Sequence, residues 1–242
     1  MGNVRIDYSD LTGMVEDGKK ASRKQKERKA RLRGLPFRVV KWTVLLAVLA
    51  VLPFGVLIRG GVFAYREWGL GTWPAMGLSV TATALLLWAY AWALGRRLGA
   101  GKGMRWVLRR GAVAVAVAYS VYGLVYVASA NAKSDDVRSE YTSLHPLLRI
   151  ASSAVILVDP GAVITDAGRT SDDYRAWGLP VNEATLHFAQ DDGFVHALDL
   201  RTKGRPEWRN RSVEIAFWAL GFHSLRHVGT ADHLHISLRL PG

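Results

Sequence analysis

The chain contains no cysteine, and acidic residues are scarce in its first half. Without thiols, an external domain would have no disulfides, and any metal site would have to use imidazole nitrogens and oxygen atoms as ligands. Residues 1–130 hold 20 Lys and Arg against 6 Asp and Glu, whereas residues 131–242 hold 12 against 14. All seven histidines lie in the second part. The formal net charge of +12 therefore comes from the first part, and the candidate catalytic side chains lie in the second.

Charged residues are also missing from three stretches, residues 42–58, 73–94 and 111–130. Each is close to the ~20 residues that cross a bilayer, and none has the periodic polar residues of a soluble core helix. The sequence therefore predicts a membrane region at 42–130 with three transmembrane helices. None of the three stretches carries an ionisable acid or base, which argues against an alternative channel-like or holin-like function.

The segments that flank these stretches differ in charge. The first 41 residues carry 12 Lys and Arg, and residues 95–110 carry six with no acid, whereas the remaining loop has only Arg59, Arg66 and Glu67. Cytoplasmic loops carry an excess of Lys and Arg. We therefore expect residues 1–41 to form a basic cytoplasmic tail, and three crossings to place residues 131–242 outside the cell.

The most basic part of the tail runs from Lys19 to Arg33 and is too charged to build a core. We expect it to lie against anionic membrane lipid. A nucleic-acid-binding arm is the alternative, but no aromatic residue interrupts the run to stack on bases. Membrane lipids are therefore expected partners of this protein, and nucleic acid is not.

Residues 131–242 combine helix and strand signals, which predicts a small α+β domain with an antiparallel sheet. Helices are expected over about 135–153, 171–177 and 207–220. Strands are expected over 155–158, 163–164, 224–228 and 234–240. A domain of about 112 residues can bury enough apolar surface to fold without disulfides.

The last strand carries two histidines on one face. Side chains alternate along a strand, so His233 and His235 point to one side while Leu234 and Ile236 point into a core. Asp232 lies at the entry of the strand, after a turn signal, where a bend could bring its carboxylate to the same cleft. The two imidazoles and this carboxylate are candidates for a polar site.

A metal site needs further ligands, and the best candidates are His187 in Thr185-Leu186-His187 and Asp199 in Ala197-Leu198-Asp199. Two neutral imidazoles and one carboxylate, with one position left to water, form a typical catalytic zinc shell. The spacing leaves open whether His196 replaces His187 as the ligand, since His196 lies only three residues before Asp199. In a regular strand His196 faces away from Asp199, which favours a packing role or a contact with a metal ligand.

These segments resemble the zinc peptidases that cut D-amino-acid-containing bonds of bacterial cell walls, a group of lysostaphin-type, D-Ala-D-Ala-type and hedgehog-type domains. The family pattern is Ser/Thr-x-His, Ala-x-Asp and a closing His-x-His or acid-x-x-His, all present here in order. Arg169-Thr170 also matches the Arg-Ser/Thr end of the strand that precedes the first ligand. The resemblance covers about residues 160–240.

The resemblance implies a Zn²⁺ ion held by His187, Asp199 and His235. It further implies that Asp232 is the general base, and that His233 stabilises the oxyanion or orients the water. Arg169 would hold a substrate carboxylate or the developing negative charge. Structural alternatives are a turn role for Asp232, a strand-end salt bridge for Asp199 and an ion pair of Arg169 with Asp166 or Asp172.

One spacing departs from the family. Six residues usually separate the first His from the Asp, whereas eleven separate His187 from Asp199. A hairpin tip at residues 190–193, Gln-Asp-Asp-Gly, would accommodate the extra length and preserve both strand ends. Of the other histidines, His145 is expected in a surface or packing position, and His223 and His227 receive no role.

The sequence thus predicts a zinc metallopeptidase anchored in a bacterial plasma membrane and acting on peptidoglycan stem or cross-bridge peptides. It leaves open whether the enzyme is a carboxypeptidase or an endopeptidase. The alternative is a non-hydrolytic zinc-binding receptor or interaction domain on a membrane anchor, which hedgehog-type domains show to be compatible with the same ligands.

Overall fold

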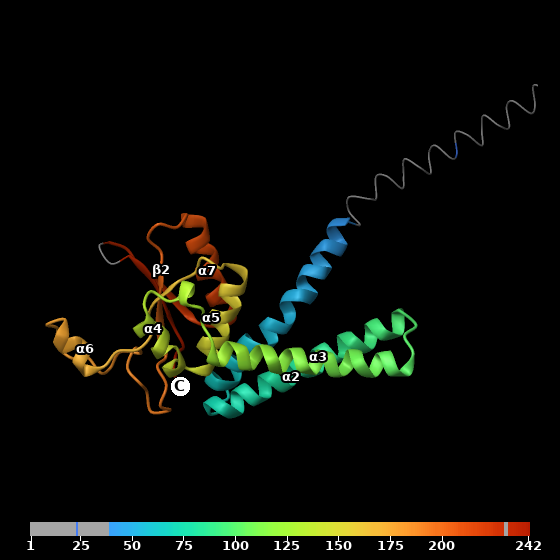
Figure 1. Ribbon diagram of the computed structural model, residues 1–242, viewed down its shortest axis with the longest axis horizontal. Coiled ribbons are helices and arrows are strands. Elements are labelled where there is room, and N and C mark those ends of the chain that lie inside the picture. Colours follow the sequence, from blue (N-terminus) through green and yellow to red (C-terminus); the bar gives the residue numbers. More distant parts are fainter. Residues whose placement is uncertain (1–22, 24–38, 230–231) are drawn as a thin grey trace, which may run out of the picture. The chain divides into compact units, whose positions relative to one another are not determined.

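The computed structural model describes residues 39–229 and 232–242, together with Arg23 (Figure 1). Most of the expected basic tail therefore lies outside the described residues. The chain divides into two compact units, residues 1–51 and 52–242. The second unit contains the sheet, all the histidines and most of the membrane region.

Three long apolar helices open the described part: Val39–Arg66, α2 (Thr72–Arg97) and α3 (Lys102–Val125). Each is long and apolar enough to cross a membrane, which confirms the three predicted spans and indicates a membrane protein. They extend beyond the uncharged stretches because Lys and Arg are good helix formers, and Arg96 and Arg97 suit the negative end of α2.

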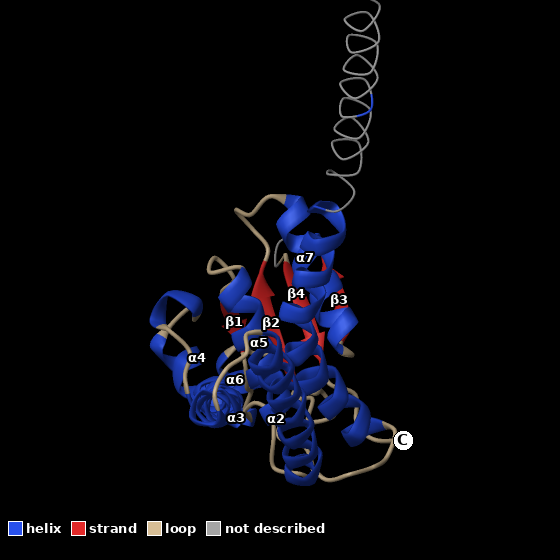
Figure 2. Ribbon diagram, turned by 90° about the vertical axis from the view of Figure 1, so that its right-hand side faces the viewer, coloured by secondary structure: helices blue, strands red, loops and turns tan. Residues whose placement is uncertain are grey.

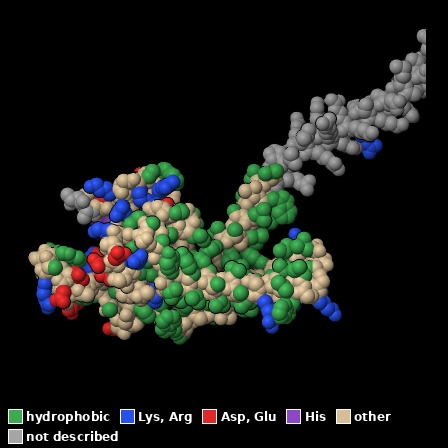
Figure 3. Space-filling model, in the orientation of Figure 1, with side chains coloured by type: hydrophobic (Ala, Val, Ile, Leu, Met, Phe, Trp, Pro, Cys, Tyr) green, Lys and Arg blue, Asp and Glu red, His purple; other side chains and the backbone are tan. Residues whose placement is uncertain are grey.

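The surfaces of these helices suit contact with lipid. Large apolar side chains such as Leu85 and Val115, 62 % and 63 % exposed, point outwards from α2 and α3. Figure 3 shows hydrophobic side chains over much of this part of the molecule. A water-soluble helix would carry polar side chains on such a face.

The α+β region forms a four-stranded antiparallel sheet in the order β1-β2-β4-β3, which confirms the predicted fold class (Figure 2). The strands are β1 (Ile164–Asp166), β2 (Ala197–Arg201), β3 (His223–His227) and β4 (His233–Ser237). The helices are α4 (Asp135–Ser139), α5 (Pro146–Val158), α6 (Ser171–Ala176) and α7 (Glu207–Leu220), with short 3₁₀ turns η1 (Ser129–Asn131) and η2 (Glu140–Ser143).

Two sequence predictions about the start of this region were wrong. The single helix expected over 135–153 is broken into α4, η2 and α5, because a residue that precedes proline is pushed out of the helical conformation. His145 has a ψ of 134°, and α5 begins at Pro146. The strand expected over 155–158 is the last turn of α5, since a short apolar run does not by itself distinguish a strand from a buried helix.

The predictions for α6 and α7 were confirmed by their capping residues. The Thr170 hydroxyl and the Asp173 carboxylate form a reciprocal capping box at the start of α6. Gly221 ends α7 with a φ of 100°, a conformation that glycine adopts without steric cost. Acidic residues in the first turn of each helix interact favourably with the positive end of the helix dipole.

The apolar core continues from the sheet into the membrane helices. Leu198, Leu234 and Ile236, from one face of the sheet, belong to the same buried cluster as Ile58 and Val62 of the first long helix. The packing is close at Gly61, where an added Cβ would lie 2.5 Å from Leu147 of α5. At Gly123 of α3, an added Cβ would lie 3.3 Å from the Cα atom of Ile150.

Polar contacts reinforce this junction at the end of α3. The Tyr141 hydroxyl lies 2.8 Å from the carbonyl oxygens of both Gly123 and Arg149, which share its single proton. The Arg149 guanidinium donates to the carbonyl oxygen of Leu124 at 2.6 Å. A cation at this position also suits the negative end of the α3 dipole. The membrane helices and the α+β region therefore share one core.

Candidate metal centre

The register of the sheet brings the predicted ligands together. Asp199 of β2 pairs with His235 of β4, and His233 of β4 pairs with His227 of β3. These side chains lie on the face opposite Leu234, which is 2 % exposed and belongs to the core. The predicted alternation along the last strand is therefore confirmed.

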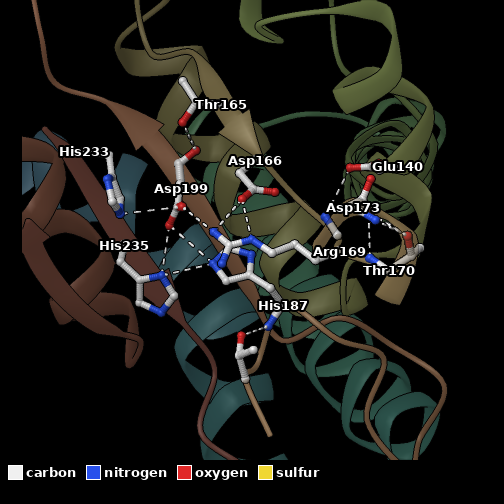
Figure 4. Close-up of polar contacts among 12 residues, drawn as sticks. Glu140, Thr165, Asp166, Arg169, Thr170, Asp173, His187, Asp199, His233 and His235 are labelled. Carbon is white, nitrogen blue, oxygen red and sulfur yellow. Dashed lines mark hydrogen bonds and ion pairs between the residues drawn. The ribbon is translucent and has the colours of Figure 1, made fainter. Parts of the chain in front are cut away.

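His187 reaches this face from the loop before β2 (Figure 4). Its backbone N–H donates to the Thr185 hydroxyl at 3.0 Å, and its carbonyl oxygen accepts from the Arg169 N–H at 2.9 Å. The His187 side chain is almost fully buried. Its Nδ1 atom is buried without a hydrogen-bond partner among the described residues.

The potential ligand atoms lie at the spacing of a tetrahedral site. His235 Nδ1 is 2.9 Å from Asp199 Oδ1, His187 Nε2 is 3.3 Å from His235 Nδ1, and His187 Nε2 is 3.5 Å from Asp199 Oδ1. Zinc bonds of about 2.0–2.1 Å at tetrahedral angles place ligand atoms about 3.3–3.4 Å apart. These three residues, the sheet cluster, could therefore hold a metal ion.

The sheet cluster keeps its carboxylate ionised. Burial by itself raises the pKa of the Asp199 carboxyl, but hydrogen bonds from His187 and His235 and the charges of His187 and His233 outweigh it. The resulting pKa lies well below its usual range. A permanently ionised carboxylate between two imidazoles is a suitable ligand for a hard or borderline divalent cation.

Arg169 lies beside the sheet cluster, as predicted. Its Nε atom donates to Asp166 Oδ2 at 2.8 Å, and its Nη2 atom forms an ion pair with the same oxygen at 2.6 Å. Nη2 also donates to Asp199 Oδ2 at 3.4 Å. Burial lowers the pKa of Arg169, but a hydrogen bond with Tyr174 and the charge of Asp166 raise it overall. The expected ion pair with Asp166 is present, while Asp172 pairs with Arg175.

Asp232 does not reach the cleft, contrary to our expectation of a bend. It faces the side of the sheet that α7 covers, where its carboxylate accepts hydrogen bonds from Arg226 at 2.6 and 2.9 Å and from the Thr202 hydroxyl at 2.7 Å. The hydrogen bonds from Arg226 and then Thr202 lower its pKa to about 2. The ion pair with Arg226 explains why this carboxylate stays on the other face.

A cavity of about 390 Å³ opens at the sheet cluster. Its lining residues come from the loops after β1 and before β2 and from β2, β3 and β4: Arg169, Thr185, His187, Asp199, Leu225, His227, His233 and His235. His233 Nε2 lies 3.6 Å from Asp199 Oδ2, so this histidine is part of the site. A small ligand can therefore approach the sheet cluster from solvent.

His227 is the lining residue that sequence analysis left without a role. Its ring stacks on that of His233, with centroids 4.7 Å apart and planes at 26°. The signal was present in the sequence, because residues equally far from the centre of a hairpin face each other. Residues 227 and 233 are both three positions from residue 230.

The extra residues between His187 and Asp199 form the predicted hairpin. Ala189 pairs with Val195, and Gln190 N donates to Phe194 O at 2.9 Å. His196 follows this hairpin and faces away from the sheet cluster. The structure thus brings His187, and not His196, to Asp199 and His235.

His196 belongs instead to a second group with His145 and Asp192, which we call the tip cluster; both histidines are buried and Asp192 is exposed. His196 Nε2 lies 3.0 and 3.1 Å from the two Asp192 carboxylate oxygens, and His145 Nε2 lies 3.6 Å from Asp192 Oδ2. The Thr72 hydroxyl lies 3.0 Å from His145 Nε2 and donates to Asp192 Oδ2 at 2.9 Å. By atom spacing alone, this group could also hold a metal ion.

The hydrogen bonds of His145 favour a metal-free tip cluster. His145 Nδ1 accepts from the Leu147 N–H at 3.2 Å, as the cap of α5. A neutral ring with an accepting Nδ1 carries its proton on Nε2, which then donates to Thr72 and has no lone pair for a metal. The prediction of a packing role for His145 agrees with its complete burial.

The tip cluster predicts a loss of stability in acid. Burial first, and then the charges of His196 and Arg149, lower the pKa of His145 from 6.5 to about 3, although Asp192 opposes the shift. Between these values the unfolded chain binds a proton that the folded protein does not. Below pH 6.5, the free energy of unfolding should therefore fall by about 1.4 kcal/mol per pH unit from this residue.

Chemical denaturation of the detergent-solubilised protein at pH 7.5 and pH 5.5 measures this effect. The control is His145→Asn, which keeps a side-chain cap for α5 but cannot titrate. Between pH 7.5 and pH 5.5, we expect the free energy of unfolding to fall by about 1.4 kcal/mol more for wild type than for this variant. Equal pH dependence of the two proteins would contradict the assignment.

Comparison of the chain with protein-family models, curated proteins and solved structures gave no match. Functional interpretation therefore depends on the geometry of the sheet cluster and on the chemistry of its residues.

Proposed function

We propose that the protein is a membrane-anchored zinc metallopeptidase that hydrolyses peptidoglycan stem or cross-bridge peptides. The observation that carries the proposal is the tetrahedral spacing of His187, Asp199 and His235 at the wall of an open cavity. The order of these residues and the nearby Arg169 add the resemblance to cell-wall peptidases.

The residues of the sheet cluster fit a zinc ion by their chemistry. Two imidazoles and one carboxylate are a common set of protein ligands in catalytic zinc sites, which leave one position open. When bound there, zinc would supply a polarised scissile carbonyl and a water with a pKa near ~7. The cavity gives a peptide access to that position.

His233 is the best-placed proton acceptor among the described residues. It lines the cavity next to Asp199, its side chain is 27 % exposed, and His227 stacks on its ring. In the proposed reaction His233 takes a proton from the attacking water and passes it to the leaving amine. This role replaces the one first expected of Asp232, whose carboxylate is bound to Arg226 on the other face.

Arg169 is placed to recognise a negatively charged substrate group. Its guanidinium lines the cavity, and its raised pKa keeps it charged. In the proposal it holds a peptide carboxylate or the developing oxyanion by charge-assisted hydrogen bonds. Asp166 orients the guanidinium through two short contacts.

The proposed location is the bacterial plasma membrane, with the tail in the cytoplasm and the sheet outside. The excess of Lys and Arg in residues 1–41 and 95–110 supports this orientation. The cell wall lies on the outer side of that membrane, where residues 131–242 would meet peptidoglycan peptides. Lipids contact the three long helices.

Two adjacent residues on opposite faces of the sheet provide the test. We expect His233→Ala to bind zinc and to lose hydrolysis of peptidoglycan fragments by about 10²–10⁴-fold, the usual contribution of a general base. Asp232→Asn should bind zinc and keep turnover within a few-fold, because its carboxylate does not line the cavity. The measurements are metal content and product release by full-length protein in detergent.

The reverse result would return the proton-transfer role to Asp232. If wild type binds zinc and cleaves nothing, a second function takes precedence: a zinc-dependent receptor or interaction domain. The engagement of Asp232 by Arg226 favours that alternative, because it removes the carboxylate first expected as general base. Absence of metal from wild type would contradict both functions.

A further inference from the structure

Two ligands of the sheet cluster lie at the two ends of one hairpin. His187 precedes the hairpin and Asp199 follows it on β2, with the Ala189–Val195 bridge between them. The third ligand, His235, lies on β4 and is fixed by the sheet. The separation of His187 from the other two ligands therefore depends on how this hairpin is held.

The tip of the hairpin is bound by the ends of two membrane helices. Asp192 at the tip accepts hydrogen bonds from Thr72, the first residue of α2, at 2.9 Å and from Tyr65, in the last turn of the helix Val39–Arg66, at 3.4 Å. Its neighbour Phe194 packs edge-on against Trp73, with ring centroids 6.0 Å apart.

The same carboxylate also faces both histidines of the tip cluster. His196 lies against it at 3.0 Å, and His196 Nδ1 lies 3.3 Å from the carbonyl oxygen of Leu238, just beyond β4. The base of the hairpin is held as well, since Val195 exchanges backbone hydrogen bonds of 2.8 and 2.9 Å with His145 and Ser143. The hairpin is thus connected at its tip to the membrane helices and at its base to the segment before α5.

We propose that Asp192 is a positioning residue, through which the membrane helices set the geometry and the metal affinity of the sheet cluster. Thr72 and Tyr65 act as its anchors. The inference rests on the proposed metal centre. It makes the membrane region part of the site, in addition to its role as an anchor.

The contact between Thr72 and Asp192 can affect the positions of His187 and Asp199. Asp192 is the only acidic side chain that the described Thr72, Tyr65, His145 and His196 side chains contact. Without the Thr72 hydroxyl, the carboxylate loses its donor on α2, and the tip can shift because only Tyr65 and the Phe194–Trp73 contact then connect it to the membrane helices among the described residues. A movement of the tip would also displace His187 and Asp199, because each is only a few residues away along one side of the hairpin.

The test is the binding of Co²⁺, a spectroscopic probe of ligand geometry, to full-length protein in lipid nanodiscs. Thr72→Val removes the hydroxyl and keeps the β-branched shape, and Asp192→Asn removes the charge. We expect each to weaken Co²⁺ and Zn²⁺ binding by about 10- to 100-fold, as loss of outer contacts does at other metal sites. The d–d absorption of the Co²⁺-saturated protein should also change.

Two controls share the chemistry of these substitutions. Thr81→Val makes the same change in the same helix, where the Thr81 hydroxyl donates to Gly77 O within α2, and should leave binding and spectrum unchanged. Thr72→Ser restores the hydroxyl and should restore wild-type binding. His235→Ala identifies the site, because metal that it retains belongs to the tip cluster.

The outcomes separate the inference from the proposed function. Absence of Co²⁺ binding by wild type, or full binding by His235→Ala, would reject the sheet cluster as the metal centre and the inference with it. Wild-type affinity and spectrum in both Thr72→Val and Asp192→Asn would reject the inference alone. A lower unfolding midpoint with unchanged affinity and spectrum would also reject it, because the contact would then be only structural.

Discussion

Replacement of His235 by alanine is expected to remove most of the zinc affinity that we propose for the sheet cluster. Structural zinc sites with four ligands contribute roughly 10–16 kcal/mol, so the share of one ligand is about 3 kcal/mol or more. Loss of that share lowers the affinity by about two orders of magnitude or more. His187→Ala should behave in the same way, since its Nε2 lies 3.3 Å from His235 Nδ1.

Competition with a chromophoric chelator measures the affinity directly. His223→Ala is the matched control, because His223 lies at the start of β3 opposite Ser237 and does not line the cavity. It should bind zinc as wild type does. Equal affinities of wild type and His235→Ala would show that the three close ligand atoms form a hydrogen-bonded cluster without metal.

Residues 131–242 expressed alone are expected not to reach the native fold. Leu147 packs against Gly61 and Ile150 against Gly123, and the Arg149 guanidinium donates to Leu124 O. In the fragment, two large side chains lose about half of their burial and one charged hydrogen bond is lost. Together these losses lower the free energy of unfolding by on the order of 5 kcal/mol. Domains are stable by only about 5–15 kcal/mol, so the fragment should be mostly unfolded or aggregated.

Size-exclusion chromatography and cooperative thermal unfolding measure this outcome. The control is co-expression of residues 131–242 with residues 1–130, which supplies the missing half of the core on a separate chain. We expect the two pieces to copurify and to unfold in one transition. A soluble, cooperatively folded fragment 131–242 would show that the shared core is not needed.

The features that depend on local chemistry were predictable from sequence. Uncharged runs indicated the three long helices, and the helices expected over 171–177 and 207–220 correspond to α6 and α7. Alternation along β4 predicted that His233 and His235 share one face. Motif order then selected His187 and Asp199, which the structure places beside His235.

The features that depend on distant partners were not predictable. Alternation alone would have put Asp232 on the face opposite His233, and we expected a bend that the ion pair with Arg226 opposes. The contact of Asp192 with Thr72 joins residues 120 positions apart, and no local pattern signals it. The membrane helices are apolar on all sides, so their sequences show no hydrophobic periodicity. The sequence therefore did not indicate that the side carrying Ile58 joins the core.

The shared core also bears on how the protein could be shed from the membrane. Many surface enzymes are released when a protease cuts the stalk between an independent domain and its anchor. Here a cut between α3 and α4 would leave Leu147, Tyr141 and Arg149 in contact with the membrane helices. The α+β region should therefore stay at the membrane after such a cut, and the proposed hydrolysis should remain confined to the bilayer surface.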